Sequence, residues 1–417
     1  MQAATTDRRL SERGILFVVG AVQFVNILDF MMVAPLGPRL AIAVDMPESN
    51  LAYAVAAYTF AAAAAGLLGS LFLDRFDRRP ALAIALLGLA LGTAAGSLAS
   101  NFTQLIAARM LAGVFGGPAT SLALAIVSDV IPAERRGRAM GAVMGAFAAA
   151  SVLGVPLGIA LAEIGGWHLP FIGVGAMGLV VVVMVLVLLP PLRGHLDDAV
   201  ALRGAGEQLG GLVTMLRRPL VLSSYAMTFT VNAAAFVLMP NIATYLQNNL
   251  GLPESQLKWL YLSGGVVSFF TTRAAGVLVD RAGSARVALV GSLGFALVTW
   301  AGFARTDVLP FETALLPCMF VLFATFMFSN GVRNVAYTTL TTRVPAPEER
   351  ARFMSLQSAV QHVSAAAGAS LSAHLLTTDA HHRLVGMPTL AWLSIGLSVL
   401  LPLLVRNVQR QLPALRP

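Results

Sequence analysis

Apolar runs of twenty or more residues recur along the whole 417-residue chain, and only 12% of its residues are charged. A soluble domain carries about 25% charged residues, whereas a helix needs about 20 apolar residues to cross about 30 Å of hydrocarbon. The single cysteine, Cys318, leaves no intrachain disulfide possible. The sequence therefore excludes an ordinary soluble enzyme, a disordered chain and a disulfide scaffold, and it predicts an all-α membrane protein.

Twelve of these runs are predicted to be transmembrane helices. Ala, Leu, Val and Gly are mixed within them without the two-residue alternation of barrel strands. Proline and clustered charges mark their ends. The predicted spans are 15–38, 51–73, 80–100, 103–128, 139–162, 169–190, 219–246, 257–279, 286–304, 312–341, 353–377 and 387–405.

The placement of the arginines predicts the orientation of the chain. Of the 28 lysines and arginines, 21 fall in tails and loops on one side of the predicted membrane, 4 on the other side and 3 within spans. Cytoplasmic loops are enriched in these residues, so we expect both termini in the cytoplasm. The arginines of the cytoplasmic loops then account for the net charge of +8. We therefore expect no nucleic-acid partner.

The two halves of the chain resemble each other. Asp74-Arg75 ends the second predicted span and Asp280-Arg281 ends the eighth, while the stretch 136–140 parallels 350–354. The alternative is that arginine-rich loops recur by chance where topology demands them. A true repeat predicts two six-helix bundles related by a pseudo-two-fold axis, with substrate bound between them near the midplane. The predicted parts are a tail at 1–14, a bundle at 15–190, a basic loop at 191–218, a second bundle at 219–405 and a tail at 406–417.

Five short motifs carry a family resemblance that extends over nearly the whole chain. They occupy residues 70–79, 109–117, 154–158, 166–171 and 276–283. At these positions the chain resembles the major facilitator superfamily, and specifically its twelve-helix drug/proton antiporter branch with the related sugar-efflux permeases. Ser70 and Asp77 replace two family glycines, and Val155 lies between the Gly and Pro of the fifth-helix motif.

The resemblance implies a fold and a mode of action. It implies the major facilitator fold, transport by alternating access and a place in the cell inner membrane. It also implies a part for Arg109 in proton coupling, and a bend in the fifth helix that seals the cavity. We expect the chain to act as a monomer.

Asp29 is predicted near the middle of the first span. A charged, unpaired carboxylate there costs several kcal/mol, and burial favours its neutral form, so it could take up and release a proton. Gln23, Asn26 and Asp29 recur every three residues and share one helical face. We interpret Asp29 as a proton carrier, an anchor for a cationic substrate, or both. The alternative is a structural aspartate paired with an arginine or a helix terminus.

Arg109 is predicted about 9 Å from the outer end of the fourth span. Its guanidinium stays charged when buried, so it cannot carry the proton. It could stabilise a nearby carboxylate or bind an anionic substrate; the alternative is an arginine that extends to the interface.

Further polar and aromatic side chains are predicted to line a substrate cavity. Adaptable aromatic linings suit amphipathic ligands of varied shape. Plain helix packing is the alternative for each of them, interfacial anchoring is the alternative for Arg333, and a hydrogen bond between helices is the alternative to a proton relay for His362. The candidates besides Gln23 and Asn26 are Phe30, Tyr225, Phe229, Asn232, Asn330, Arg333, Asn334, Gln361 and His362.

Two further groups are predicted to be mechanical. Asp74 could cap a helix N-terminus and pair with an arginine, which would latch the cytoplasmic ends of the helices. The resemblance implies that this latch favours the outward-open state. In the fifth span, Gly154, Pro156 and Gly158 allow close helix packing and a kink. The predicted cytoplasmic gate consists of Asp74, Arg75, Arg78, Arg79, Arg138, Asp280 and Arg281.

These observations favour a proton-driven exporter of small organic molecules. The alternative is proton symport, or facilitated uptake, on the same fold. No P-loop motif is present, so direct ATP drive is disfavoured. An intramembrane enzyme built on Ser370 and His374 is disfavoured because the chain has no Gly-x-Ser-x-Gly or His-Glu-x-x-His motif. We expect no metal and no cofactor; the expected partners are a small-molecule substrate, protons and the lipid bilayer.

Overall fold

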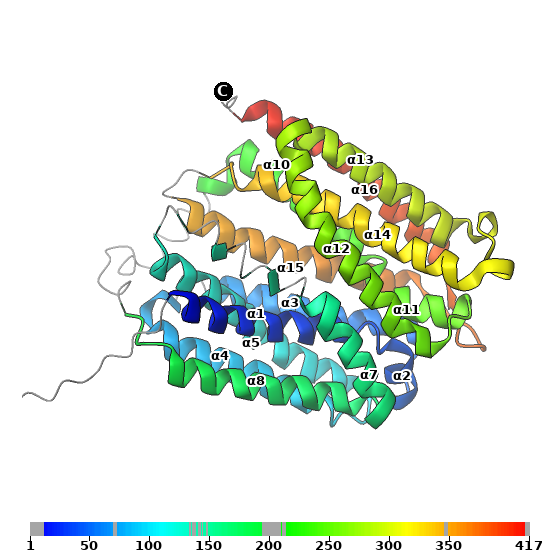
Figure 1. Ribbon diagram of the computed structural model, residues 1–417, viewed down its shortest axis with the longest axis horizontal. Helices are drawn as coiled ribbons and strands as arrows, with labels where there is room; N and C mark the ends of the chain where they lie inside the picture. Colours follow the sequence, from blue (N-terminus) through cyan, green and yellow to red (C-terminus); the bar gives the residue numbers. More distant parts are fainter. Residues whose placement is uncertain are drawn as a thin grey trace, which may run out of the picture.

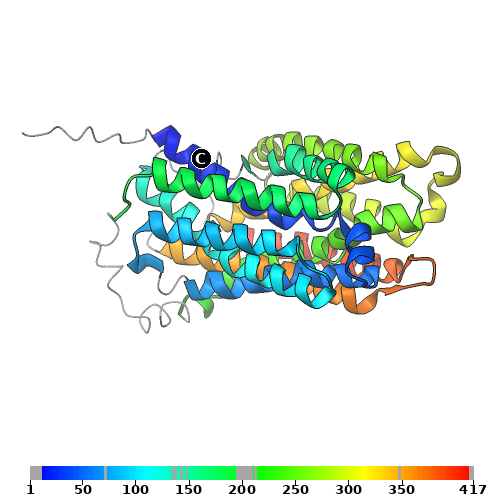
Figure 2. The same ribbon diagram turned by 90° about the horizontal axis from the view of Figure 1, so that it is seen from below.

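Long helices lie side by side along one axis of the molecule (Figures 1 and 2). The computed structural model describes residues 12–69, 73–132, 135, 139–140, 143, 145–146, 149–193, 210, 214–345 and 349–412.

The first half of the chain forms the group drawn in blue to green in Figure 1. Its crossing helices are joined by short turns, some of which are themselves single helical turns. The elements are α1 (Glu12–Met32), α2 (Gly37–Ala43), η1 (Glu48–Asn50), α3 (Leu51–Gly69), η2 (Leu73–Arg75), α4 (Arg78–Gly96), α5 (Phe102–Val130), η3 (Ala150–Gly154), α7 (Val155–Gly165) and α8 (His168–Leu188).

The second half repeats this plan and adds a two-stranded hairpin. The strands pair antiparallel, with Thr377 opposite Val385. The elements are α10 (Pro219–Phe236), η5 (Met239–Asn241), α11 (Ile242–Thr244), η6 (Tyr245–Asn249), α12 (Glu254–Ala282), α13 (Ser284–Thr299), η7 (Trp300–Ala304), η8 (Thr306–Val308), α14 (Phe311–Thr341), α15 (Arg350–Leu375), β1 (Thr377–Thr378), β2 (Leu384–Val385) and α16 (Met387–Gln411).

Among the described residues, ten helices are long and apolar enough to cross a membrane. The fifth crossing, at 139–165, is divided by a π-helical segment and is not among these ten helices. Its described residues are helical. The eleventh predicted span, α15, is long enough but carries polar side chains such as Gln357 and His362, because it packs in the interior against α3 and α10. The prediction of an all-α protein with two six-helix bundles is confirmed.

Several predicted spans are interrupted. The first, predicted to reach residue 38, ends at Met32, because Pro35 and Pro38 cannot continue its hydrogen bonds. The seventh is divided near Pro240 into α10, η5, α11 and η6. Three five-residue π-helical segments occur in the crossings: η3 lies within the fifth, η6 ends the seventh and η7 ends the ninth. Such segments widen the helix locally and are frequent at functional sites.

The two halves meet along two seams. One joins α3 to α15, and the other joins η3 and α7 to α12. In the second seam the backbones approach closely at Gly265, where an added Cβ would lie 2.7 Å from the carbonyl oxygen of Ser151. A side chain at Gly265 would therefore force the halves apart.

Candidate transport site

A buried ion pair lies inside the first half. Arg109 Nη1 on α5 donates to Asp29 Oδ1 on α1 at 2.8 Å, and the two side chains are 1% and 0% exposed. Arg109 Nη2 also lies 3.4 Å from the main-chain oxygen of Asp29. The two residues that the sequence singled out separately are therefore partners.

The two carboxylate oxygens of Asp29 have different surroundings. Oδ1 accepts from Arg109 and from Thr93 Oγ1 on α4, at 2.7 Å from the hydroxyl. Oδ2 is buried and has no hydrogen-bond partner among the residues that the structure describes. The carboxylate is thus held through one oxygen only.

Tyr58 on α3 supports the pair from the side. The Arg109 guanidinium lies over its ring, 4.6 Å from the centroid. The Tyr58 hydroxyl donates to Asn26 Oδ1 at 2.5 Å, and Asn26 Nδ2 lies 2.7 Å from the carbonyl oxygen of Gly116. Asn26 therefore ties α1 to α3 and α5 beside the ion pair.

Glycines on α5 make this arrangement possible. An added Cβ at Gly113 would lie 2.3 Å from the carbonyl oxygen of Tyr58, and one at Gly117 would lie 2.2 Å from that of Ala62. Because these contacts are to main-chain atoms, any larger residue would push α3 away and move Tyr58. Sequence reasoning missed Thr93 and Tyr58, although the glycines beside Arg109 were a signal of close packing.

Arg333 occupies the interior of the second half. Its side chain on α14 is fully buried, its Nη2 donates to the carbonyl oxygen of Val231 on α10 at 3.2 Å, and its guanidinium stacks 3.9 Å from the centre of the Phe295 ring. Nε and Nη1 have no hydrogen-bond partner within the described part of the chain. No described carboxylate forms an ion pair with Arg333, in contrast to Arg109.

Two of the predicted cavity residues, Asn232 and Gln361, belong to a neutral cluster around the Tyr337 hydroxyl. Gln361 Nε2 and Asn232 Nδ2 lie 3.2 and 3.4 Å from that oxygen. His362 lines a cavity of about 10 Å³ between the halves, with Ser121 and Ser358 among its other lining residues; this is about the size needed for one water.

The remaining predicted cavity residues lie in varied places. The Phe30 ring packs against Phe236 of the other half, with centroids 5.7 Å apart. Tyr225 stacks on Phe353 and donates to its carbonyl oxygen. Gln23 is buried, Phe229 is exposed, and Asn330 and Asn334 are half-buried.

The predicted gate residues lie at the arginine-rich end. Arg78 is buried and donates to Asp129 Oδ2 at 3.1 Å, and Arg79 donates to the carbonyl oxygen of Leu186. Arg75, Asp280 and Arg281 are exposed. The Asp74 side chain and Arg138 lie outside the described residues.

The predicted fifth-helix motif lies beside α1. Pro156 stands in the first turn of α7, directly after the π-helical segment η3. An added Cβ at Gly154 would lie 2.7 Å from the Leu28 side chain, and one at Gly158 would lie 4.0 Å from Met32. Gly154 therefore lets this crossing approach the helix that carries Asp29.

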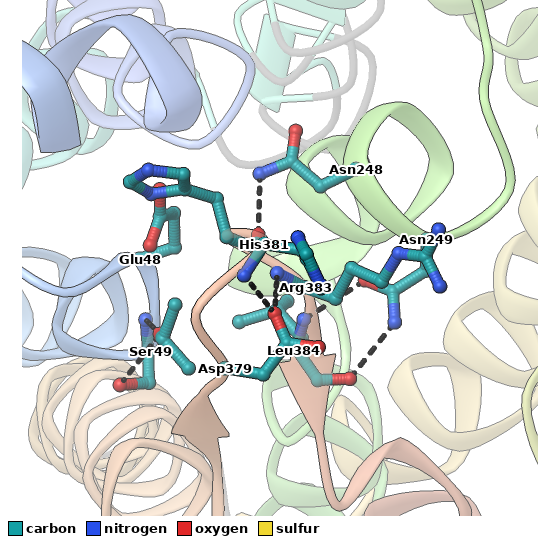
Figure 3. A network of polar contacts seen from close by, with 10 residues as sticks. Glu48, Ser49, Asn248, Asn249, Asp379, His381, Arg383 and Leu384 are labelled. Carbon is teal, nitrogen blue, oxygen red and sulfur yellow. Dashed lines mark hydrogen bonds and ion pairs between the residues drawn. The ribbon is translucent and has the colours of Figure 1, made fainter.

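Bonds that bridge the halves gather at the end opposite the arginine-rich one. Glu48 is only 3% exposed, and its Oε1 lies 2.8 Å from His382 Nδ1 in the β1–β2 turn. Asp379, Asn248 and Asn249 hold that turn in place (Figure 3). The other bridges are Arg39–Glu254, Lys258–Glu163, Tyr53–His374 and Ser49–Thr378.

The described ion pairs at the arginine-rich end stay within one half. Glu12–Arg135 lies in the first half, and Arg218–Glu349 lies in the second. The ion pairs therefore fasten the two halves to each other at only one end of the described structure.

The family model of the Major Facilitator Superfamily matches residues 19–241 and 224–414. The chain belongs to the major facilitator superfamily. It is therefore a membrane transporter rather than an enzyme, and the predicted family and fold are confirmed.

Curated relatives of this facilitator include resistance and efflux proteins. The chain is 30% identical over 303 residues to a "Chloramphenicol resistance protein" of Streptomyces lividans, covering 72% of this chain and 73% of the relative. It is 24% identical over 402 residues to a "Purine ribonucleoside efflux pump" of Escherichia coli, covering 94% and 92%.

Solved structures show the same fold at low sequence identity. A D-xylose–proton symporter matches with a TM-score of 0.74 at 18% identity, covering 94% of this chain and 97% of the symporter. A bacterial homologue of the human lysosomal transporter Spinster, in an inward-facing and unoccupied conformation, matches with a TM-score of 0.72 at 15% identity, covering 97% and 98%.

Proposed function

We propose that this facilitator is a proton-coupled exporter of small organic molecules. The observation that carries the proposal is the buried Asp29–Arg109 pair, whose Asp29 Oδ2 has no partner among the described residues. Protonation would cancel the carboxylate charge and remove the charge-assisted bond to Arg109. The guanidinium itself stays charged. The pair is therefore an element with two states, and a single proton selects between them.

Alternating access is needed for this element to work. In the closed pair Asp29 is fully buried and cannot exchange protons with water. After protonation, Arg109 would be a buried charge without its partner, which costs about 3–5 kcal/mol. That cost favours a rearranged state in which the guanidinium reaches water or cargo.

The position of the bonds between the two halves supports the assignment of this conformation to one state of the transport cycle. Following the arginine count, we place the arginine-rich end and both termini in the cytoplasm, and the chain, as a monomer, in the cell inner membrane. The bridged end then faces outward, and we assign the conformation to the inward-facing state. We propose that the predicted gate residues of both halves, including Asp74 and Arg138, form the cytoplasmic latch in the outward-facing state.

The cargo is proposed to be a neutral, hydrogen-bonding organic molecule. Two observations support this class. The relatives are named for chloramphenicol resistance and for purine ribonucleoside efflux, and the cluster of Asn232, Tyr337 and Gln361 offers amide and phenol groups without a net charge.

Transport into inverted vesicles with an acidic lumen tests the proposal. The wild type, Asp29→Asn and Asp45→Asn would be compared for accumulation of chloramphenicol, purine ribonucleosides and a panel of sugars. Asp45 is an exposed acid in the α2–η1 turn, so its variant controls for the loss of one charge. We expect the wild type and Asp45→Asn to accumulate at least one compound, and Asp29→Asn to bind it without pH-driven accumulation.

Two results would contradict the proposal. Unchanged pH-driven transport in Asp29→Asn would remove Asp29 from the mechanism. Cargo that moves in the same direction as the protons would make the protein a symporter, which is the alternative function on this fold.

A further inference from the structure

The hydroxyl of Thr93 has two hydrogen-bond acceptors but only one hydrogen. Its Oγ1 lies 2.7 Å from Asp29 Oδ1 and 2.8 Å from the carbonyl oxygen of Leu89, one turn earlier on α4. A threonine hydroxyl donates one bond and can accept others. The hydrogen can therefore serve only one of the two oxygens at a time.

The charge on Asp29 decides which oxygen receives the hydrogen. An ionised carboxylate forms the stronger, charge-assisted bond, so the hydroxyl then donates to Oδ1. When the proton sits on Oδ1, the carboxyl becomes the donor and Thr93 Oγ1 the acceptor. The Thr93 hydrogen then turns to the Leu89 carbonyl oxygen. Both arrangements use the same heavy-atom positions.

We propose that Thr93 is the positioning residue of the proton site, and that its hydroxyl holds Asp29 in both charge states. The inference rests on the proposed proton coupling and adds to it a mechanical element. When Asp29 is neutralised, its bond to Arg109 weakens, whereas its bond to Thr93 is kept. Donor and acceptor are exchanged when the proton sits on Oδ1, and Thr93 remains the donor when the proton sits on Oδ2. α1 and α4 therefore stay joined while Arg109 on α5 is released.

The other groups around Asp29 cannot exchange the roles of hydrogen-bond donor and acceptor with it. Arg109 is always a donor, and the Tyr58 hydroxyl is engaged with Asn26. The titratable groups of the neighbouring α7 and α8, Glu163 and His168, are exposed at the helix ends and bond elsewhere, to Lys258 and to the Ser97 carbonyl oxygen. Among the described partners of the Asp29 side chain, Thr93 alone can both donate and accept.

An infrared pH titration of the reconstituted protein tests this role without any cargo. The signal is the carboxyl C=O band that is present in the wild type and absent in Asp29→Asn. Thr93→Val keeps the shape of the side chain and removes the hydroxyl, whereas Thr93→Ser keeps the hydroxyl. Thr59→Val is the matched control, because the described hydrogen bonds of the buried Thr59 hydroxyl go to carbonyl oxygens of its own helix, those of Val55 and Ala56.

We expect Thr93→Val to move the midpoint of the titration to higher pH by about one unit, a tenfold change in proton affinity. The reason is that the variant loses a bond made more strongly to the ionised form than to the neutral one. Thr93→Ser should restore the wild-type midpoint, and Thr59→Val should leave it unchanged.

The outcomes separate this inference from the proposed function. A wild-type midpoint in folded Thr93→Val, with proton-driven transport still lost in Asp29→Asn, would overturn the role of Thr93 alone. An equal shift in Thr59→Val would also overturn it, because the effect would then be general to the loss of a buried hydroxyl. Unchanged proton-driven transport in Asp29→Asn would end the proposed function, whatever Thr93 does.

Discussion

Each half of the transporter buries one arginine, and the two are held differently. Arg109 faces a carboxylate, a ring and a main-chain oxygen. Arg333 faces a ring and a main-chain oxygen, without an ion pair to any described carboxylate. The difference teaches that, within the described structure, only the buried arginine of the first half is paired with a buried charge that one proton can switch. The arginine of the second half is a fixed charge that aromatic and carbonyl groups must accommodate.

Removal of Arg109 should have the largest effect. Arg109→Met leaves Asp29 buried without its cation, which costs about 3–5 kcal/mol of unfolding free energy. The double variant Asp29→Leu/Arg109→Met removes both charges and should regain most of that loss. Thermal unfolding in detergent measures both variants. Equal losses in the single and double variants would mean that the pair contributes nothing beyond packing.

Tighter packing beside Arg109 should have the next largest effect. In Gly117→Ala the new Cβ collides with the carbonyl oxygen of Ala62, so α3 must shift and carry Tyr58 away from the guanidinium. We expect a loss of about 1–3 kcal/mol. The control is Gly276→Ala on α12, where no atom lies within 4 Å of the added Cβ. Comparable losses in the two variants would show that helix propensity, not the contact with α3, is responsible.

Removal of Arg333 should change stability far less than removal of Arg109. Arg333→Met discards a buried charge that has no ion pair in the described structure, so the cost of its desolvation disappears together with one carbonyl bond and the stacking on Phe295. We expect a change within about 1 kcal/mol, because buried charges are often replaced by apolar residues without loss of stability. A loss as large as that of Arg109→Met would reveal a hidden anionic partner and would break the comparison.

The sequence predicted the architecture and both members of the ion pair, but not their contact. Hydropathy and arginine placement are local properties, so they predict spans well. The pairing of Asp29 with Arg109 joins positions 80 residues apart and depends on how α1 and α5 pack. The estimated depth of Arg109 alone could not reveal it. A single threonine or tyrosine in an apolar run carries almost no signal, which is why Thr93 and Tyr58 were missed. Pro35 and Pro38 stand in the sequence where α1 ends, but the predicted first span ran through Pro35 to residue 38, six residues beyond the observed end at Met32.

A partly exposed ion pair, Asp77 with Arg193, provides the smallest effect and a reference for the buried pair. Asp77 caps α4 by accepting from the Arg79 amide at 3.0 Å, and it also accepts from the Leu192 amide and from Arg193 Nε. Partial desolvation acts to raise the pKa of Asp77, but these hydrogen bonds outweigh it and the pKa is lowered. The ionised form therefore stabilises the fold at neutral pH.

Asp77→Asn keeps the capping oxygen and removes the charge, so we expect a loss of about 0.2–1 kcal/mol at pH 7. Because the pKa in the folded state is lower than in the unfolded state, the advantage of the wild type is complete above the unfolded value, about 3.9. It disappears as the pH falls through the folded value. Unfolding of both proteins at neutral and acidic pH measures this convergence. A stability difference between the two proteins that stays constant with pH would mean that Asp77 acts through its shape as a cap and not through its charge. Asp77 would then give no measure of what a charge contributes near the surface, for comparison with the buried Asp29–Arg109 pair.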